Sequence, residues 1–204
     1  MNRIRHIFAG GNTSQGFFNY FDYIINLSDA KRLYILKGGP GTGKSTFMKY
    51  IGSEAINNGY DVEYFHCSSD NNSIDGVLIP SLKAAMVDGT APHTIDPAYP
   101  GVVDEIINLG EFWDKNELVE YKDRVLPART EIKFNFKRAY RYLRAAASLY
   151  EDIEAINKKY LDNRKIKKLT YDLVEELFQK TDKKIGAKKV STERCLFASA
   201  ITPN

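Results

Sequence analysis

Short apolar runs alternate with amphipathic stretches in the first half of the chain, and this pattern predicts a sheet flanked by helices. A helix is predicted over residues 46–57, where Asn58-Gly59 supplies a stop signal. Four apolar runs predict short buried strands: residues 6–10, 33–36, 61–67 and 84–87. Strands that alternate with helices are typical of a mostly parallel α/β sheet.

The segments between these elements are interpreted from their polarity and their prolines. Residues 11–16 read as a polar turn, and residues 17–25 as a helix with Phe17, Phe21, Ile24 and Ile25 on one face. Residues 70–76 read as a polar loop. A long irregular connection follows the last strand, marked by Pro92, Pro97 and Pro100.

The second half of the chain has a helical period. Apolar residues recur at spacings of three and four through residues 127–160, at Ile132, Phe136, Tyr140, Leu143, Ala147 and Tyr150. Pro127 is acceptable near the start of such a helix. The lysine-rich residues 158–189 predict a further helix centred on 169–178, followed by a solvated linker.

The pattern therefore divides the chain into three parts. Residues 1–126 are expected to form an α/β core, and residues 127–190 a helical arm with a basic linker. Residues 191–204 are expected to form a strand, because Arg194–Ala198 repeats the pattern of Arg5–Ala9. This strand would be either the start of a second homologous half or the last strand of the core. The repeat favours a second half, so we expect the chain to be a fragment of a longer protein.

Composition adds few constraints. In 204 residues there is no apolar run near the ~18 residues that a membrane span needs, so no membrane partner is expected. The two cysteines, Cys67 and Cys195, lie far apart in the sequence and imply no disulfide framework. A cytoplasmic location is therefore the expectation.

Charge is distributed unevenly. Residues 61–120 carry twelve acidic and two basic side chains, whereas residues 121–144 carry eight basic and two acidic ones. Two interpretations are open: the two regions are complementary surfaces that pack together, or the basic helix is a surface that meets phosphates. Arg138, Arg141 and Arg144 follow an i, i+3 spacing, so one of them is a candidate arginine finger or part of a solvated face.

The most specific chemical signal is the segment 38–46, Gly-Gly-Pro-Gly-Thr-Gly-Lys-Ser-Thr, which matches the phosphate-binding loop G-x-x-x-x-G-K-[ST]. It lies between a predicted strand and a predicted helix, as the motif requires. Lys44 is predicted to bind the β- and γ-phosphates of ATP, and the Ser45 hydroxyl to bind Mg²⁺. The predicted nucleotide-binding residues are Gly39, Pro40, Gly41, Thr42, Gly43, Lys44, Ser45 and Thr46.

Two aspartates complete the predicted catalytic set with Lys44. Asp88 ends an apolar strand, where a carboxylate can hold Mg²⁺ together with Ser45; the alternative is an ordinary turn aspartate in Asp88-Gly89. Asp70 follows the second strand of the predicted nucleotide-binding unit and is a candidate to orient a water or an acceptor hydroxyl. Asp75 is a candidate for the same role, and a helix-capping role is equally favoured for it. No glutamate follows Asp88, so the base that many ATPases use is missing there.

The chain also resembles a family of uncharacterised bacterial P-loop ATPases built from two tandem nucleotide-binding halves. The resemblance spans nearly the whole chain and rests on residues 5–9, 38–46, 60–70, 88–93 and 104–110. It implies nucleotide binding and a P-loop fold. It also implies that residues 196–204 open the second half, whose own glycine loop would come later.

Together these features predict an ATP–Mg²⁺-binding P-loop protein of the α/β class. The leading hypothesis is an ATPase that couples hydrolysis to movement of the helical arm or to a protein partner. Alternatives are a kinase that transfers the γ-phosphate to a small acceptor, and a nucleotide-sensing module with little turnover. Trp113 and the tyrosines show no repeated stacking pattern, so no sequence-specific recognition of nucleic acid is predicted.

Overall fold

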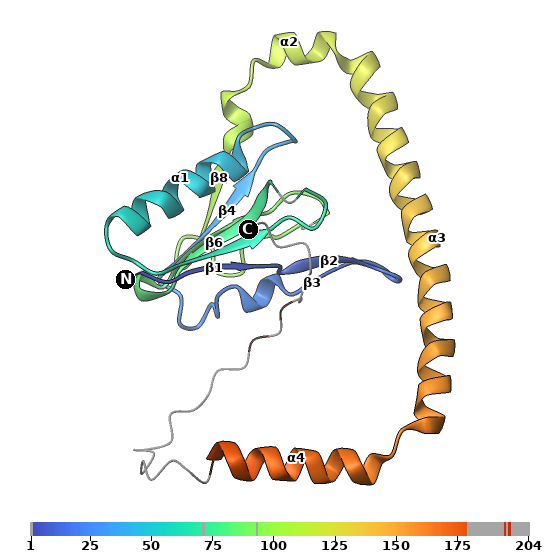
Figure 1. Ribbon diagram of the computed structural model, residues 1–204. Coiled ribbons are helices and arrows are strands. Elements are labelled where there is room, and N and C mark those ends of the chain that lie inside the picture. The colour runs from blue at the N-terminus through green and yellow to red at the C-terminus, as the bar shows by residue number, and fades with distance from the viewer. Residues whose placement is uncertain (1, 71, 93, 179–193, 195, 197–204) are drawn as a thin grey trace.

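The computed structural model describes residues 2–70, 72–92, 94–178, 194 and 196. They form an α/β core and a long helical arm (Figure 1). The core holds a six-stranded sheet in the order β1 (Ile4–Ile7), β5 (Val62–His66), β6 (Ile74–Ile79), β7 (Ala84–Asp88), β4 (Arg32–Lys37) and β8 (Asp104–Asn108). A two-stranded hairpin pairs β2 (Gly10–Thr13) with β3 (Gly16–Asn19).

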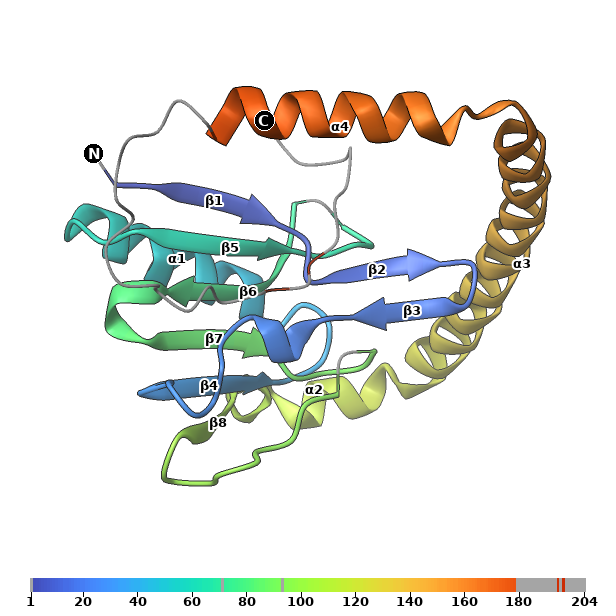
Figure 2. The ribbon, with the colours of Figure 1, turned by 90° about the horizontal axis from the view of Figure 1, so that it is seen from below.

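The sheet is mostly parallel, which confirms the predicted fold class. β1 pairs with β5, and β4 pairs with both β7 and β8, all in parallel. β6 is the exception, because it lies antiparallel between β5 and β7. The parallel strands therefore present their carboxyl ends at one edge of the sheet, on the side where the arm stands (Figure 2).

Each face of the sheet buries its own apolar cluster. The helix α1 (Lys44–Asn57) covers one face, where Met48 packs with Leu36, Val62 and Val77. On the other face a short 3₁₀ turn, η1 (Phe21–Tyr23), places Phe21 and the following Ile24 against Ile35, Phe65 and Val87. Burial of these side chains supplies the hydrophobic driving force that holds the core together.

The predicted loop over residues 70–76 is wrong in its second half, because β6 begins at Ile74. All six residues of β6 are buried, since the strand has a neighbour on either side and apolar clusters on both faces. Such a strand shows no alternation of polar and apolar positions, and this explains why the pattern did not reveal it. β8, which follows the proline-rich connection, was not predicted either.

The predicted helix over residues 17–25 is also wrong. Its first part is β3, which returns from β2 through a turn where Gly16 has a φ of 112°, a conformation that favours glycine. Its second part is the single turn η1. The apolar residues Phe21 and Ile24 are buried as expected, but an irregular segment, not a helix, places them there.

The arm consists of α2 (Lys115–Glu120), α3 (Lys122–Tyr160) and α4 (Asn163–Phe178). α3 ends where the sequence predicted, but it begins five residues before Pro127, which lies inside it. The start of α2 is fixed by Asp114, whose Oδ1 accepts hydrogen bonds from the amides of Asn116 and Glu117. α4 matches the further helix that was predicted around residues 169–178.

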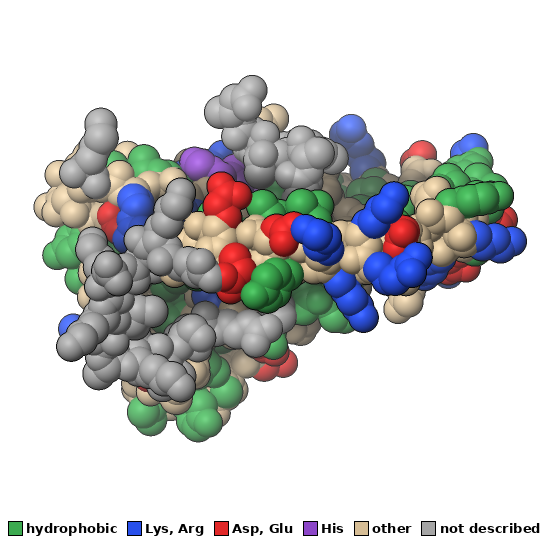
Figure 3. Space-filling model, turned by 60° about the horizontal axis from the view of Figure 1, so that its bottom comes forward, with side chains coloured by type: hydrophobic (Ala, Val, Ile, Leu, Met, Phe, Trp, Pro, Cys, Tyr) green, Lys and Arg blue, Asp and Glu red, His purple; other side chains and the backbone are tan. Residues whose placement is uncertain are grey.

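The described residues of the arm are largely exposed. No described residue of α3 or α4 is buried, and apolar, basic and acidic side chains lie open on the face shown in Figure 3. The Tyr140 hydroxyl of α3 donates a hydrogen bond of 2.9 Å to Asn12 Oδ1 of β2, which joins the arm to the hairpin. No helix in the described part of the chain is long and apolar enough to cross a bilayer.

The expected strand over residues 191–204 lies outside the described residues, apart from Arg194 and Leu196. Arg194 donates to Glu63 Oε2 at 2.7 Å and to the Tyr23 carbonyl at 3.0 Å. Leu196 packs against the cluster that contains Phe65. The three-part division of the chain and the second homologous half remain predictions.

Candidate functional site

The glycine-rich segment forms the loop between β4 and α1, as its sequence predicted. Three of its glycines have positive φ angles: Gly38 at 141°, Gly41 at 83° and Gly43 at 84°. Residues with a Cβ rarely adopt such angles, so the loop needs glycine at these positions. Pro40, Gly41, Gly43 and Thr46 are exposed, whereas Gly39, Thr42 and Ser45 are partly buried. The loop leads directly into the N-terminus of α1, which is the positive end of the helix dipole.

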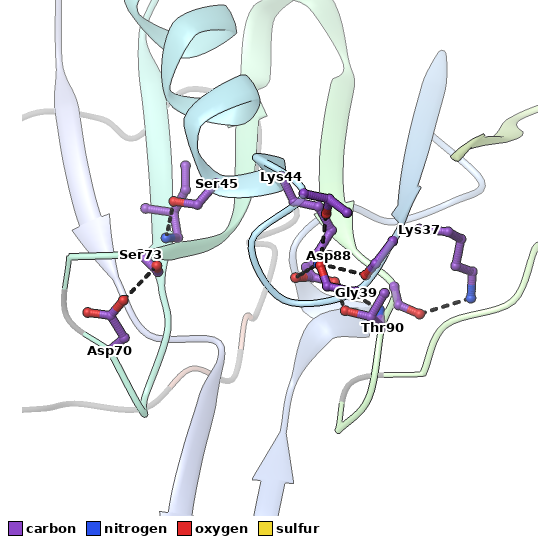
Figure 4. A network of polar contacts seen from close by, with 12 residues as sticks. Lys37, Gly39, Lys44, Ser45, Asp70, Ser73, Asp88 and Thr90 are labelled. Carbon is purple, nitrogen blue, oxygen red and sulfur yellow. Dashed lines mark hydrogen bonds and ion pairs between the residues drawn. The ribbon is translucent and has the colours of Figure 1, made fainter. Parts of the chain in front are cut away.

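Lys44, the first residue of α1, is folded back into the loop and is only 8% exposed. Its Nζ donates hydrogen bonds to the carbonyl of Gly38 at 2.8 Å and to that of Gly39 at 3.0 Å. It also lies 3.6 Å from Asp88 Oδ2 (Figure 4). A buried ammonium needs such partners to offset its lost hydration, so the loop holds the cation in one place.

Asp88 stands at the end of β7, beside the glycine loop. β7 pairs with β4 so that Asp88 lies opposite Leu36, and the following Gly89 amide donates to the Leu36 carbonyl at 3.0 Å. Its Oδ1 accepts hydrogen bonds from the amide and the hydroxyl of Thr90, while its Oδ2 faces Lys44. Asp88 therefore forms a turn, as an ordinary turn aspartate would, and it also contacts the loop lysine.

Ser45 lies on the side of Lys44 away from Asp88 in Figure 4. Its Oγ accepts a hydrogen bond of 3.0 Å from the amide of Ile74, the first residue of β6. A hydroxyl oxygen has two lone pairs, so Ser45 keeps one lone pair and its own proton for another partner. This bond ties the start of α1 to the strand that the sequence did not reveal.

Asp75 is the carboxylate whose position the sequence failed to predict. It is 4% exposed and belongs to β6, so it caps no helix. In the register of β6 with β7, Gly76 lies opposite Val87, so the next residues along, Asp75 and Asp88, are neighbours on adjacent strands. Burial raises the pKa of Asp75 to about 7; the negative charge of Asp88 raises it too, and Lys44 lowers it. Both charges act on Asp75 because it stands beside the loop.

Asp70, by contrast, is occupied in a turn. Its Oδ2 accepts from the Ser73 hydroxyl at 2.8 Å and its Oδ1 from the Asn72 amide at 3.0 Å (Figure 4). The bond from Ser73 is the main cause that lowers the pKa of this carboxyl. Each oxygen keeps acceptor capacity for another partner and the residue is exposed, so its predicted role in orienting a water or an acceptor stays a prediction.

Two segments from after β7 close around the loop. Lys37 Nζ at the end of β4 donates to the carbonyls of Gly89 at 2.9 Å and Ile95 at 2.6 Å, which holds the connection after Asp88. The 3₁₀ turn η3 (Leu109–Phe112) is followed by Trp113, whose ring lies against Gly39. Neither contact follows from the motif, because both segments are distant from it in the sequence.

Cys67, at the end of β5, lies next to this site. Burial, and to a lesser extent the charge of Asp75, raise the pKa of its thiol to about 11. Among the described residues, no group of three or more histidine, cysteine, aspartate or glutamate side chains is arranged to hold a metal ion. A metal here would therefore depend on one or two carboxylates, the Ser45 hydroxyl and oxygens of a ligand.

Comparison with protein families gives one similarity. A family model described as "Nephrocystin 3, N-terminal" matches residues 12–82, a region that begins in β2 and includes the glycine loop, α1, β5 and β6. No curated protein and no solved structure matches the chain. The similarity thus covers the segments that build the candidate site, with the exception of Asp88 and Trp113.

Proposed function

We propose that the chain binds ATP–Mg²⁺ at the glycine loop and hydrolyses it. One observation carries the proposal: Lys44 is held by the carbonyls of Gly38 and Gly39 within a strand, glycine loop and helix unit. In this arrangement the ammonium, the loop amides and the positive helix end all favour a phosphate at the same position. The resemblance of the sequence to the tandem P-loop ATPase family agrees with ATP as the ligand.

The residues present fit a bound Mg²⁺. Hydroxyl and carboxylate oxygens are the ligands that this ion prefers, and it usually keeps several waters and phosphate oxygens as well. Ser45 would supply the hydroxyl, and Asp88 would supply a carboxylate directly or through water. When bound, Mg²⁺ would neutralise charge that develops on the phosphates.

Asp75 supplies a second carboxylate beside Asp88. Residues after Asp88 are Gly89 and Thr90, so no acid follows it in the sequence. Asp75 reaches the site from β6 instead, at a place where a carboxylate would orient a water near the phosphates. In this proposal Lys44 and the loop amides stabilise the transferring phosphoryl group. Asp75 positions the attacking water, and Asp88 positions the metal.

Three hydrogen-bonded contacts and one connecting loop link the site to the arm. Tyr140 of α3 bonds Asn12, and the Asn12 amide nitrogen lies within hydrogen-bond distance of the Ser68 carbonyl and the Ser69 hydroxyl. The loop that carries these serines continues to Ile74, whose amide bonds Ser45. A ligand that draws the Ser45 hydroxyl toward a metal would act on this path, so we propose that hydrolysis is coupled to the position of α3.

A kinase is one alternative, in which Asp70, exposed and held in a turn by Ser73 and Asn72, would orient the acceptor. A sensing module without turnover remains the other alternative, and the experiment separates it from an ATPase. Binding of ATP–Mg²⁺ would be measured by calorimetry and by the fluorescence of Trp113, the only tryptophan in the chain. Release of inorganic phosphate would be measured on the same samples.

The matched variants are Lys44→Ala and Lys31→Ala. Lys31 is an exposed lysine just before β4, so its loss removes the same charge from the same unit away from the loop. We expect Lys44→Ala to weaken ATP binding at least ~100-fold, which corresponds to roughly 3 kcal/mol, and Lys31→Ala to leave it unchanged. Equal affinity in Lys44→Ala and the unmodified chain would refute nucleotide binding at this loop. Tight binding with no phosphate release would favour the sensing module.

A further inference from the structure

One face of α3 carries a row of basic side chains that the ATPase proposal does not use. Lys133, Lys137, Arg141 and Arg144 follow one another at spacings of four, four and three residues. Residues at these spacings lie on the same side of a helix, so the four cations form a row about 16 Å long. Like charges four residues apart destabilise a helix, and this segment accepts two such pairs.

Three cations of the row border a hollow in the surface of α3. It has a volume of about 320 Å³ and is lined by Phe134, Lys137, Tyr140, Arg141 and Arg144. Phe134 is 58% exposed, so an aromatic ring as well as three cations faces a ligand in this hollow. Proteins bind single-stranded nucleic acid with aromatic rings next to basic side chains, because the bases stack on the rings while the phosphates pair with the cations.

These cations are not neutralised by the acidic part of the core. Among the described residues, no ion pair joins a basic side chain of residues 121–144 to residues 61–120, although the two regions have opposite charge. The interpretation that the two regions pack as complementary surfaces is therefore not supported. Arg138 differs from its neighbours, because its guanidinium lies over the ring of Tyr142.

The orientation of the row is fixed by Tyr140. Its hydroxyl bonds Asn12 of the hairpin, so the face that carries Tyr140 turns toward the core. α3 stands beside the carboxyl edge of the sheet, toward which the parallel strands point (Figure 2). A single strand of nucleic acid is narrow enough to follow a row of cations along one helix, whereas a flat bilayer does not reach a face turned toward the core. A single small phosphate compound would use only part of a row of this length.

We propose that this face of α3 binds the phosphate backbone of single-stranded nucleic acid, without regard to base sequence. Lys133, Lys137, Arg141 and Arg144 pair with successive phosphates, and Phe134 and Tyr140 offer their rings to bases. The proposal goes beyond ATP hydrolysis and does not depend on it. Backbone contacts and stacking tolerate any base, so this mode of binding needs no base-specific pattern.

The test is fluorescence anisotropy of a labelled single-stranded DNA of about 20 nucleotides, titrated with the whole chain without ATP. The test variant combines Lys137→Glu, Arg141→Glu and Arg144→Glu. Its matched control combines Lys159→Glu, Lys165→Glu and Lys167→Glu, which changes the net charge equally on other parts of the arm. All of these side chains are exposed, so both variants should keep the helical circular dichroism of the unmodified chain.

We expect the test variant to weaken binding more than about tenfold near 50 mM salt, and the control less than about threefold. The slope of log affinity against log salt should fall by about 2 in the test variant, since each lost phosphate contact contributes about 0.7. Phe134→Ala should weaken binding by at least about fivefold through lost stacking. These titrations would be repeated in Lys44→Ala, where unchanged DNA binding separates this site from the glycine loop.

Three outcomes would overturn the proposal. The first is no binding of the oligonucleotide even at low salt. The second is an equal loss in the test and control variants, which would indicate only a general effect of net charge. The third is binding to vesicles of anionic phospholipid, abolished in the test variant, with no binding of the oligonucleotide; this would assign the face to a membrane surface.

Discussion

Trp113 lies directly over Gly39 in the glycine loop. A Cβ atom added at Gly39 would stand 2.5 Å from Cη2 of the indole, closer than two carbon atoms can approach without displacement. The indole is also partly exposed, at 36%, so it meets solvent as well as the loop. A side chain from a segment some seventy residues away therefore limits which residues the loop accepts.

Gly39→Ala should destabilise the folded chain by roughly 1–3 kcal/mol, because the new methyl group must displace the Trp113 ring. Chemical denaturation followed by circular dichroism measures this change. In the background of Trp113→Ala the same substitution should cost much less, since the obstructing ring is gone. If the cost of Gly39→Ala is the same in both backgrounds, the contact between ring and loop does not explain it.

Asp75→Asn should change how stability depends on pH. The pKa of Asp75 is about 7 in the folded chain and near 3.8 in an unfolded chain, so the folded state holds the proton more tightly. This group's contribution to stability is complete below pH ~4 and is lost as pH rises to about 7, by up to about 4 kcal/mol. Without Mg²⁺, the free energy of unfolding of Asp75→Asn, compared with that of the unmodified chain, should therefore be more favourable at pH 8 than at pH 4.

Asp70→Asn is the matched control for this measurement. The pKa of Asp70 is lowered by the Ser73 hydroxyl, so its contribution is present above pH ~4 and is lost as pH falls through the folded pKa. The two substitutions should therefore alter opposite ends of the pH profile. Urea midpoints at a series of pH values would show this, and identical profiles for both variants would contradict the assigned roles.

The sequence located the strand, glycine loop and helix unit because its information is local. A strand, a glycine loop and a helix follow one another within 26 residues, from Arg32 to Asn57, and Asp88 was placed correctly as the end of an apolar strand. The position of Asp75 is not local. It depends on β6 running antiparallel between two parallel neighbours, and nothing within residues 70–79 specifies those partners.

The same reasoning explains the other differences. β3 and η1 carry the apolar spacing of a helix, but pairing with β2 and burial against the sheet override it. Trp113 reaches Gly39 only because β8 lies next to β4 and brings η3 to the end of the loop. Contacts across the sheet therefore account for most of what sequence periodicity could not predict.

Cys67 should react slowly with iodoacetamide. Its thiol has a pKa of about 11, because burial and the charge of Asp75 disfavour the thiolate, which is the reactive form. In a Cys195→Ser background at pH 8, the rate should be at least ~100-fold below that of the same chain in urea. Asp75→Asn should increase the rate. Alkylation of the folded chain at the rate of an unfolded one would disprove this environment.

Tyr140→Phe should loosen the arm, because it removes the hydroxyl that bonds Asn12. The loss of one partly buried hydrogen bond should cost about 1 kcal/mol. Limited proteolysis within residues 122–160 should become faster. Tyr150→Phe is the control, since Tyr150 is an exposed tyrosine of the same helix, at 63%. Equal proteolysis of the two variants would show that Tyr140 does not hold the arm to the hairpin.

The uninterrupted length of α3 gives the molecule mechanical leverage. A helix of 39 residues is about 58 Å long, and it starts at Lys122, close along the chain to the Trp113 segment that touches the glycine loop. If its direction changed there by about 10°, its far end at Tyr160 would travel ~10 Å. A small displacement at the glycine loop, with no change of fold, would thus become a movement at the end of α3 about as large as the diameter of a helix.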